Sequence, residues 1–255
     1  GSGAYKLFDE DGFTINMIDP TNFPATGNPV FYAGGGNLVG IYPEARDFFY
    51  AHHKQAERII LLPHTVAKNE DLLSELGSNA YIFAREKVSY EYLKKQAPKA
   101  NIFLDHDMAL CLDPNEIINN ETIGLTASIA KKAWYKISGG NDPSAIPRPK
   151  RILRNKVFEY RTLREKTTTG TFFREDVEAE GRTTPDGNHD LSTQYEHGTE
   201  HRQLTDHTVT RLLHYINHFE KIETDRLHIC IAAALLGKEV DFYPNSYFKC
   251  RAVYE

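Results

Sequence analysis

The residues best placed to do chemistry lie in the stretch 224–238, which reads TDRLHICIAAALLGK. Arg226 and His228, a long cation and a titratable ring, fall in the first turn of a predicted helix, where unpaired backbone amides already attract anions. Thr224 can cap this helix by accepting a hydrogen bond from an amide, and Gly237 can end it in the left-handed conformation. The pattern is typical of a phosphate or carboxylate site, although cations at a helix start are also common in surface salt bridges.

Two further cations follow predicted strands in the C-terminal half. Arg174 comes directly after the predicted strand 169–173. Its planar guanidinium can hold a carboxylate or a phosphate through two parallel hydrogen bonds, which a lysine cannot do. Lys249 follows the last predicted strand, 240–243, but a lysine there is by default a surface residue. Arg174 is therefore the stronger candidate for an anion site.

Glycines and polar residues follow predicted strands in the N-terminal half as well. The run GGGN at 34–37 can bring the backbone close to a ligand, form a nest of amides, or simply make a tight turn. Its spacing matches neither a dinucleotide-binding motif nor a P-loop. The next three predicted strands are followed by side chains that could bind a ligand or carry a proton: His64, Arg85, Asp105 and Asp107.

These candidates require an α/β chain, because the carboxyl ends of parallel strands meet at one edge of a sheet. Short apolar runs alternate with helical patterns in both halves, as in βαβ units. The predicted strands are 30–33, 58–63, 80–84, 101–104, 169–173, 219–222 and 240–243. The predicted helices begin after Pro43 and then cover 69–76, 86–96, 117–138, 208–217 and 224–236, with a last helix from about Ser246. Residues 229–236 are apolar on every face, so we expect that helix to be buried.

Two stretches interrupt this alternation. A basic run rich in glycine and proline, at 139–151, is the best predicted linker in the chain. Residues 175–206 are polar and show no periodicity. We expect this second stretch to bury little apolar surface and to act as a mobile lid that orders when substrate binds.

The composition is that of an ordinary soluble protein. Apolar residues make up 40%, charged residues 25%, and the net charge of −5 argues against a general nucleic-acid binder. Cys111, Cys230 and Cys250 are far apart in apolar surroundings, which favours reduced core cysteines over a disulfide framework or a metal site. No apolar run is long enough to span a bilayer and no signal peptide is visible. The opening GSG resembles an expression scar, which leaves open whether natural residues precede it.

The string TDRLHICIAAALLGK, followed by YPNSYFK, resembles the C-terminal signature of the polysaccharide pyruvyl transferase family. The resemblance continues along the chain in the same order. Its segments are GGGN at 34–37, a P-Q-[ST]-like segment at His64, R-E-x-x-S from Arg85, R-x-D from Arg174 and N-x-Y-x-K ending at Lys249. Two departures stand out: His64 replaces the family's glutamine, and residues 38–40 (LVG) lack the acid that commonly follows GGGN.

Similarity to this family implies two Rossmann-like domains that face a cleft, like GT-B glycosyltransferases. Residues 4–140 would form the acceptor-side domain and residues 141–255 the donor-side domain. The implied reaction moves the carboxyvinyl skeleton of phosphoenolpyruvate onto two hydroxyls of one sugar, in a polysaccharide or its lipid-linked precursor, and forms a pyruvate ketal with release of phosphate. Phosphoenolpyruvate is then a co-substrate, and no cofactor or metal is expected. Such an enzyme would be cytoplasmic, and could be peripheral to the inner face of the inner membrane.

The same resemblance assigns roles to the candidates. The donor carries a phosphate and a carboxylate, so we expect Arg174 and Arg226 to bind it, with Lys249 as a further cation. His228, kept protonated by the dianionic donor, is the expected general acid at the methylene carbon. The acceptor is expected to contact Gly35, Gly36, Asn37, His64 and Arg85. The base is left open among Asp105, Asp107 and His64.

Other functions fit parts of this pattern. A GT-B nucleotide-sugar glycosyltransferase of polysaccharide biosynthesis would share the fold, but the sequence shows no signature for a base or a ribose. Metal-dependent hydrolysis would use a cluster from the polar stretch, but that segment is not HExxH; the cluster is His189, Asp190, His197, His201 and His207. A binding module without catalysis is separated from an enzyme only by assay. The sequence leaves open the acceptor sugar, the bridged hydroxyls, the ketal stereochemistry and the oligomeric state.

Overall fold

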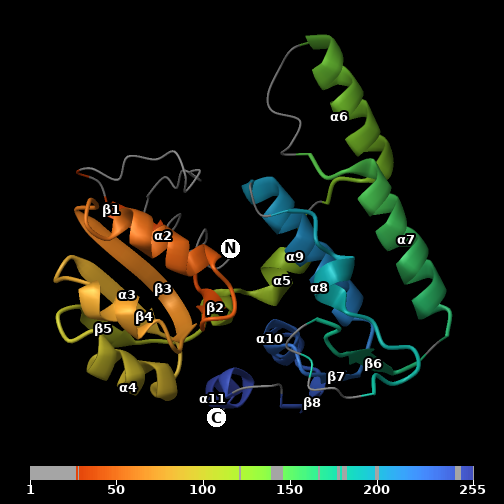
Figure 1. Ribbon diagram of the computed structural model, residues 1–255. Helices are drawn as coiled ribbons and strands as arrows, with labels where there is room; N and C mark the ends of the chain where they lie inside the picture. Colours follow the sequence, from red (N-terminus) through yellow and green to blue (C-terminus); the bar gives the residue numbers. More distant parts are fainter. Residues whose placement is uncertain are drawn as a thin grey trace. The chain divides into compact units, whose positions relative to one another are not determined.

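The protein divides into two compact units in the computed structural model, each built on its own parallel sheet (Figure 1). The structure describes residues 27, 29–120, 122–138, 146–165, 167–176, 179, 183–198, 201–244 and 248–254. Of these, 29–111 and 248–254 form the N-terminal unit, and 112–244 form the C-terminal unit. The division falls between Cys111 and Leu112, so the helices at 114–138, which we expected in the domain 4–140, belong to the C-terminal unit.

The N-terminal unit is organised on a five-stranded sheet in which every pair is parallel. Its strands are β1 (Pro29–Tyr32), β2 (Gly35–Leu38), β3 (Arg58–Val66), β4 (Ala80–Ala84) and β5 (Asn101–Leu104). The order is β1-β3-β4-β5, and β2 pairs with the last residues of β3, where Gly35 lies opposite His64. Ile59, Leu61 and Ile82 lie on one face of the sheet and are fully buried, whereas Ile60, Tyr81 and Phe83 on the other face are partly exposed.

Helices connect these strands and pack on the sheet. They are α2 (Glu44–His52), α3 (Glu70–Glu75) and α4 (Lys87–Gln96), followed by the 3-10 helix η1 (Met108–Cys111) and, at the end of the chain, α11 (Lys249–Tyr254). The start of α4 is fixed by Glu86, whose carboxylate accepts from the Ser89 amide at 2.8 Å. The Ser89 hydroxyl in turn accepts from the Val66 amide at 2.7 Å and donates to the Val66 carbonyl at 3.1 Å, which ties α4 to the end of β3.

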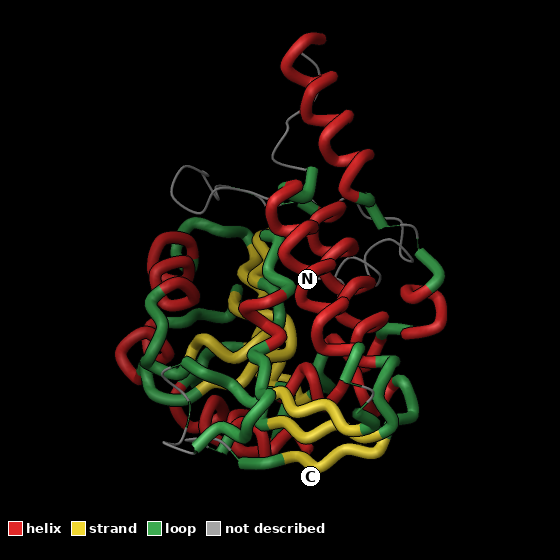
Figure 2. Tube along the Cα trace, turned by 90° about the vertical axis from the view of Figure 1, so that its right-hand side faces the viewer, coloured by secondary structure: helices red, strands yellow, loops and turns green. Residues whose placement is uncertain are grey.

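The C-terminal unit has a three-stranded parallel sheet of order β6-β7-β8. Its strands are β6 (Thr169–Phe172), β7 (Lys221–Thr224) and β8 (Glu239–Phe242); its helices are α5 (Pro114–Ile118), α6 (Leu125–Ser138), α7 (Pro149–Leu163), α8 (Leu191–Gln194), α9 (Arg202–Ile216) and α10 (Leu227–Leu235). Figure 2 shows these helices as red tubes beside the yellow strands. The core centres on Tyr215, whose ring contacts Phe172, Tyr195 and Phe219 at centroid distances of 5.8, 5.8 and 5.3 Å.

The predicted alternation of strands and helices is confirmed, and the differences are local. The strand predicted at 219–222 lies at Lys221–Thr224, and the helix predicted from 224 begins at Leu227, so Thr224 ends a strand and is not a helix cap. The helical pattern at 117–138 is two helices, α5 and α6. Residues 139–145 of the run predicted as a linker lie outside the described residues. Its last residues belong to α7, which begins at Pro149 because a proline at the first helical position loses no hydrogen bond there.

The polar stretch 175–206 contains more structure than its composition suggested. Leu191 and Tyr195 are fully buried, and the Asp190 carboxylate caps the short helix α8 by accepting from the Ser192 amide. The prediction that this stretch buries little apolar surface is wrong at Leu191 and Tyr195, which pack into the hydrophobic core of the C-terminal unit. Its action as a lid stays a prediction.

The three cysteines differ in exposure. Cys230 and Cys250 are buried, but Cys111, predicted as a core cysteine, is exposed at the end of η1. Within the described ranges, no helix is both long enough and apolar enough to cross a bilayer.

Candidate functional site

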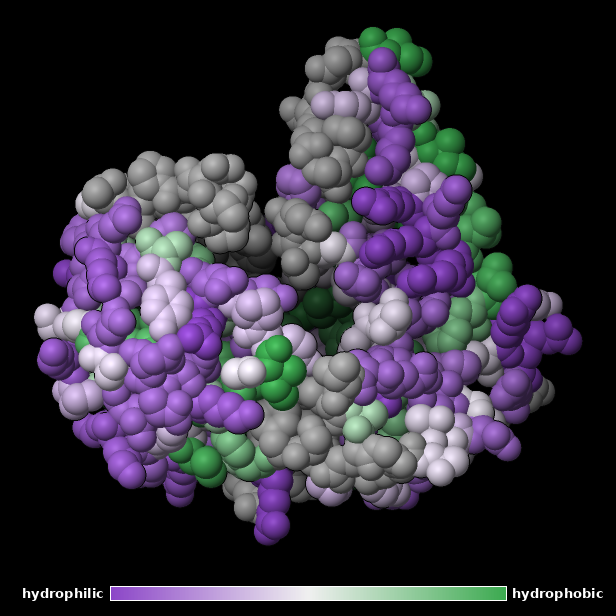
Figure 3. All heavy atoms as spheres, in the orientation of Figure 1, coloured by the Kyte–Doolittle hydropathy of each residue, from purple (hydrophilic) through white to green (hydrophobic). Residues whose placement is uncertain are grey.

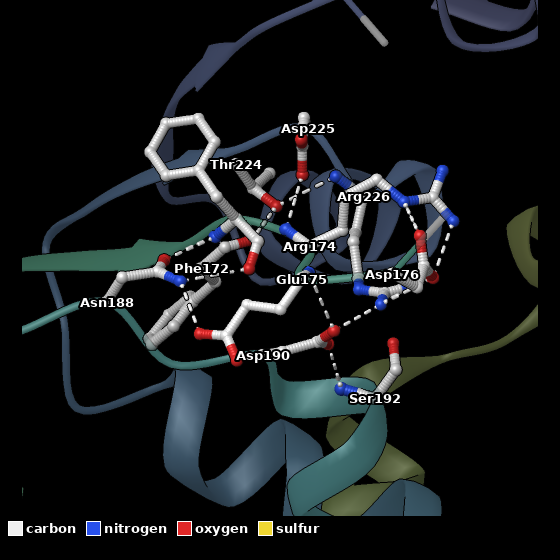
Figure 4. Close-up of polar contacts among 11 residues, drawn as sticks. Phe172, Arg174, Glu175, Asp176, Asn188, Asp190, Ser192, Thr224, Asp225 and Arg226 are labelled. Carbon is white, nitrogen blue, oxygen red and sulfur yellow. Dashed lines mark hydrogen bonds and ion pairs between the residues drawn. The ribbon is translucent and has the colours of Figure 1, made fainter. Parts of the chain in front are cut away.

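Two arginines lie side by side at the carboxyl edge of the C-terminal sheet (Figure 4). The register pairs Phe172, the last residue of β6, with Thr224, the last residue of β7. Arg174 and Arg226 each follow two residues after these strand ends. The same offset from neighbouring parallel strands therefore places both side chains at the same point of the edge.

The two guanidinium groups share one carboxylate, that of Asp176. Arg174 binds it through two bonds, from Nε to Oδ1 at 2.8 Å and from Nη2 to Oδ2 at 3.0 Å, and Arg226 Nη2 donates to Oδ2 at 3.0 Å. Arg174 is buried, whereas the Asp176 side chain is 38% exposed. The arrangement is a carboxylate-binding fork that opens toward solvent, and the carboxylate of Asp176 occupies it.

Asp190 completes the surroundings of Arg226. Its carboxylate pairs with Arg226 Nη2 and accepts from the backbone amides of Glu175 and Ser192, both at 3.2 Å. Arg226 Nε is buried and has no hydrogen-bond partner among the described residues. Arg226 thus keeps one donor that a ligand could use.

Thr224, the last residue of β7, and Asp225 after it hold the backbone on which the two arginines lie. The Thr224 hydroxyl donates to the Phe172 carbonyl at 2.7 Å and accepts from the Arg226 amide at 3.0 Å. The Asp225 carboxylate accepts from the Arg174 amide at 2.8 Å. Burial raises the pKa of the Asp225 carboxyl, and the hydrogen bond from the Arg174 amide lowers it by a smaller amount. Both side chains therefore hold the two arginine backbones in register, which is the role the structure gives Thr224 in place of the predicted cap.

His228 is the second residue of α10, and its side chain is exposed. The five residues after it, 229–233, are buried as predicted, but Ala234 is exposed, so the helix is not covered on every face. Gly237 has a φ of +70° and ends the helix in the left-handed conformation, which is confirmed. The ring of His228 is in the first turn, one residue beyond Leu227 and two beyond Arg226.

A second polar cluster lies at the carboxyl edge of the N-terminal sheet. His64 Nε2 is 3.1 Å from the Asn37 amide nitrogen and 3.0 Å from Asn37 Oδ1, and Asn37 Nδ2 lies 2.9 Å from the Tyr32 hydroxyl. His64 is 1% exposed. Two of the predicted acceptor-binding residues, Asn37 and His64, are therefore in contact through His64 Nε2.

Arg85 and Asp107 form a buried ion pair next to this cluster. Arg85 Nη1 donates to Asp107 Oδ2 at 2.6 Å, and Arg85 Nε donates to the Thr65 hydroxyl at 2.9 Å. The other oxygen of Asp107 accepts from the Ala109 amide at 2.9 Å. Asp105, by contrast, is exposed at the end of β5, where its carboxylate accepts from the His106 amide. Of the two predicted catalytic carboxylates, Asp105 is the accessible one.

The glycine run is a strand and not a nest of amides. Gly35 and Gly36 lie in β2, which pairs with β3. A Cβ on Gly34 would come within 2.8 Å of the Pro63 carbonyl oxygen. The glycine at 34 is therefore required by the close approach of two backbones, and contact of Gly35 and Gly36 with an acceptor stays a prediction.

The family model described as polysaccharide pyruvyl transferase matches residues 2–246 of the chain. The chain belongs to this family. It is 26% identical to "Putative pyruvyl transferase EpsO" of Bacillus subtilis (strain 168), over 97% of this chain and 76% of that protein. A crystal structure of a functionally uncharacterized protein from Klebsiella pneumoniae is 25% identical, with a TM-score of 0.70 over 99% of this chain and 80% of the other.

The segments that resembled the pyruvyl transferases have different structural roles. In the R-x-D segment, the arginine and the aspartate bind each other, as Arg174 and Asp176. In the R-E-x-x-S segment, Arg85 closes a buried ion pair while Glu86 and Ser89 start α4. The sequence reasoning missed Asp176 as a partner of both arginines and Asp190 as a partner of Arg226. The aspartate of R-x-D was the available signal for Asp176, whereas Asp190 lies in a stretch without periodicity.

Two further predictions concern Lys249 and the residues considered for a metal. Lys249 begins α11 in the N-terminal unit, and its side chain lies outside the described residues, so its role stays a prediction. The residues considered for a metal have other partners: the rings of His197 and His207 contact each other, His189 packs on Phe158, and Asp190 pairs with Arg226. The described part of the chain contains no group of three or more His, Cys, Asp or Glu residues able to hold a metal ion.

Proposed function

We propose that this protein transfers the pyruvyl group of phosphoenolpyruvate to two hydroxyls of one sugar, in a polysaccharide or its lipid-linked precursor, to form a ketal. Membership of the pyruvyl transferase family supports the transferase class, and the name of the B. subtilis relative agrees with it. The observation that carries the choice of donor is the pair of guanidinium groups that share one carboxylate. The GT-B arrangement, with both substrates in a cleft between two domains, is part of this proposal.

Asp176 would hold the place of the donor carboxylate. Phosphoenolpyruvate carries a carboxylate of the same geometry, so it can take over the fork of Arg174 when Asp176 moves into solvent. Arg226 then has Nη2 and the unused Nε for the phosphate. Arg174 is buried, and the side chains of Asp225 and Thr224 accept hydrogen bonds from the backbone amides of Arg174 and Arg226. These contacts hold the two guanidinium groups in place before the donor binds.

The transfer needs one acid and one base. A proton reaches the methylene carbon of the donor, which becomes a methyl group, while the first sugar hydroxyl bonds to C2 and gives its proton to the base. Phosphate then leaves C2, and the second hydroxyl bonds to C2, gives its proton to the departing phosphate and closes the ketal. His228 is the proposed acid, since its exposed ring follows Arg226 closely in the first turn of α10. Asp105 is the proposed base, because Asp107 is committed to Arg85.

Conservative exchange of the arginines tests the donor site. Arg174→Lys and Arg226→Lys keep the charge but lose oriented donors, and loss of one charged hydrogen bond costs about 1.5 to 3 kcal/mol. We therefore expect kcat/KM for phosphoenolpyruvate to fall roughly ten- to a hundredfold in each variant. Phosphate release with galactosides, glucosides and mannosides, together with NMR detection of the ketal, measures this.

Arg46→Lys is the matched control, because Arg46 pairs with Asp71 on the surface of the N-terminal unit. It should keep wild-type kinetics. If both arginine-site variants also keep them, the donor binds elsewhere. Turnover of a nucleotide sugar without any use of phosphoenolpyruvate would establish the glycosyltransferase alternative instead.

A further inference from the structure

The outer faces of α6 and α7 carry apolar side chains that the C-terminal unit leaves uncovered. Trp134 and Ile137 of α6 are 69% and 80% exposed, and Tyr160 of α7 is 65% exposed. Leu153 and Val157, on α7, are also exposed. Single exposed apolar residues are ordinary, but Leu153, Val157 and Tyr160 are spaced i, i+4 and i+7, so they form one stripe along the helix.

Cations border these side chains. At about 100° per residue, Lys150 and Arg161 fall on one side of the α7 stripe and Lys156 on the other, and all three are exposed. On α6, Lys131 and Lys136 lie on either side of Ile137 and are exposed as well. Figure 3 shows the result, with hydrophobic and hydrophilic groups alternating along the outer edge of both helices.

The one acid of α6 and α7 is turned inward. The Glu159 carboxylate accepts from the Tyr195 hydroxyl at 2.9 Å and pairs with Arg211. On the same inner side, Ile152 and Asn155 are buried against the unit. The inner face of α7 is thus already packed, so the outer stripe is not part of the core of this unit.

We propose that this docking face, the exposed stripe of α7 with Trp134 and Ile137 of α6, binds the surface of an anionic lipid bilayer. Apolar side chains bordered by cations are typical of helices that lie in the membrane interface, where lysines reach anionic headgroups and aromatic rings settle at the level of the headgroups. The cations are concentrated here although the whole chain carries a net charge of −5. The proposal does not depend on the identity of the donor.

The charges favour a bilayer over a second copy of the chain. A symmetric contact through this face would place the same lysines and arginines opposite one another, which is repulsive. An anionic bilayer neutralises every one of them. The position of α6 suits this occupant, since the helix projects beyond the other described helices of its unit in both views (Figure 1, Figure 2).

Trp134 gives a direct test because it is the only tryptophan of the chain. The 255-residue protein is mixed with vesicles of phosphatidylcholine alone or with added phosphatidylglycerol. We expect its emission to shift to the blue only with the anionic vesicles, and to be quenched by brominated acyl chains. Binding without any change in Trp134 emission would overturn the docking face.

Two sets of variants separate the apolar part from the charged part. Lys150→Gln, Lys156→Gln and Arg161→Gln together should weaken vesicle binding on the order of a hundredfold, at about fivefold per cation. Ile137→Ser with Tyr160→Ser should weaken it roughly tenfold. The matched control is Val88→Ser with Lys94→Gln and Lys95→Gln, which are exposed residues of α4 and should have no effect.

Other occupants of the face give different results. A dimer in analytical ultracentrifugation that dissociates with Ile137→Ser, and that does not bind vesicles, would overturn the bilayer in favour of a second copy. Binding to RNA or DNA that outcompetes the vesicles would overturn it in favour of a nucleic acid. Equal binding of the wild type and both sets of variants would place membrane binding on another surface.

Discussion

The carboxyl edges of the two sheets both carry an arginine bound to an aspartate, but the two pairs differ in exposure. In the N-terminal unit, the side chains of Arg85 and Asp107 are 1% and 4% exposed, and each has a further partner. In the C-terminal unit, Arg174 and Arg226 share Asp176, whose side chain is 38% exposed. The Arg85–Asp107 pair is buried and inaccessible to solvent. The carboxylate that Arg174 and Arg226 share is accessible, so it can be exchanged for a carboxylate from solution.

This difference in exposure indicates that the two ion pairs have different roles. A buried ion pair costs much to separate, because either charge left alone is desolvated without compensation. An ion pair that includes a partly exposed carboxylate contributes little free energy, so that carboxylate can move away at small cost. We therefore interpret Arg85 and Asp107 as residues that hold the N-terminal edge together, and Arg174 and Arg226 as residues that bind an anion.

The largest expected effect concerns the open edge. His228→Gln should lower kcat by roughly 10²- to 10⁴-fold, because an amide can hydrogen-bond to the donor but cannot deliver a proton. Donor binding, measured by titration calorimetry, should persist, and His228→Ala should unfold like the wild type because the ring is exposed. A glutamine variant with near wild-type turnover would reduce His228 to a binding residue.

Mutation of the buried pair at the N-terminal edge should lower the stability of the protein. Asp107→Asn leaves Arg85 buried without a counter-charge, so we expect the free energy of unfolding in urea to fall by about 3 to 5 kcal/mol. Asp105→Asn, on an exposed residue two positions away, should change it by less than about 0.5 kcal/mol while reducing turnover. If Asp107→Asn were stable and inactive, Asp107 would be a catalytic residue and the contrast between the edges would fail.

A buried pair of neutral rings gives the C-terminal unit a pH dependence of its own. Burial, and then the charges of Arg151, Arg154 and Arg211, lower the pKa of His197 to about 4; burial and the neighbouring His197 lower that of His207 to about 4. The unfolded chain therefore binds protons that the folded chain does not between pH 6.5 and 4. Stability is complete above that window and is lost as the pH falls through it, by about 3 kcal/mol for each ring.

Unfolding free energies at pH 7, 5.5 and 4.5 test this expectation. His207→Leu keeps an apolar group of similar size and should flatten the dependence, whereas His106→Gln, on an exposed residue of the N-terminal unit, should not change it. Equal slopes for the wild type and His207→Leu would show that the pair does not control acid stability.

The smallest effect distinguishes an exchangeable carboxylate from a fixed one. Asp176→Asn removes the charge that competes with the donor, so the affinity for phosphoenolpyruvate should rise roughly tenfold, about 1.4 kcal/mol. Asp241→Asn is the control, because Asp241 pairs with Lys221 on the surface of the same unit at 2.7 Å. Weaker donor binding in Asp176→Asn would mean that Asp176 is needed to orient the two arginines.

Much of this site could be predicted from strand ends. Arg174 and Arg226 meet because each follows a parallel strand by two residues. The sequence predicted both strands and both arginines, but it placed the second strand at 219–222, two residues too early, and Arg226 in the first turn of a helix. The linker interpretation failed at α7, because prolines and cations hid a helix whose inner face carries only a few buried residues. The sequence left the glycine run open between a ligand contact, a nest of amides and a tight turn, because glycines that allow two backbones to approach look the same in sequence as glycines that contact a ligand.

The sequence by itself determined the α/β class with parallel strands, the family, and the cations that can bind an anion, because these follow from local periodicity and residue type. Only the tertiary structure decided which charges close on each other and which face solvent. Arg85 and Asp107 are 22 positions apart and Arg226 and Asp176 are 50 apart. Sheet register and packing bring such pairs together, and a local pattern contains no information about the partner that a side chain meets across the sheet.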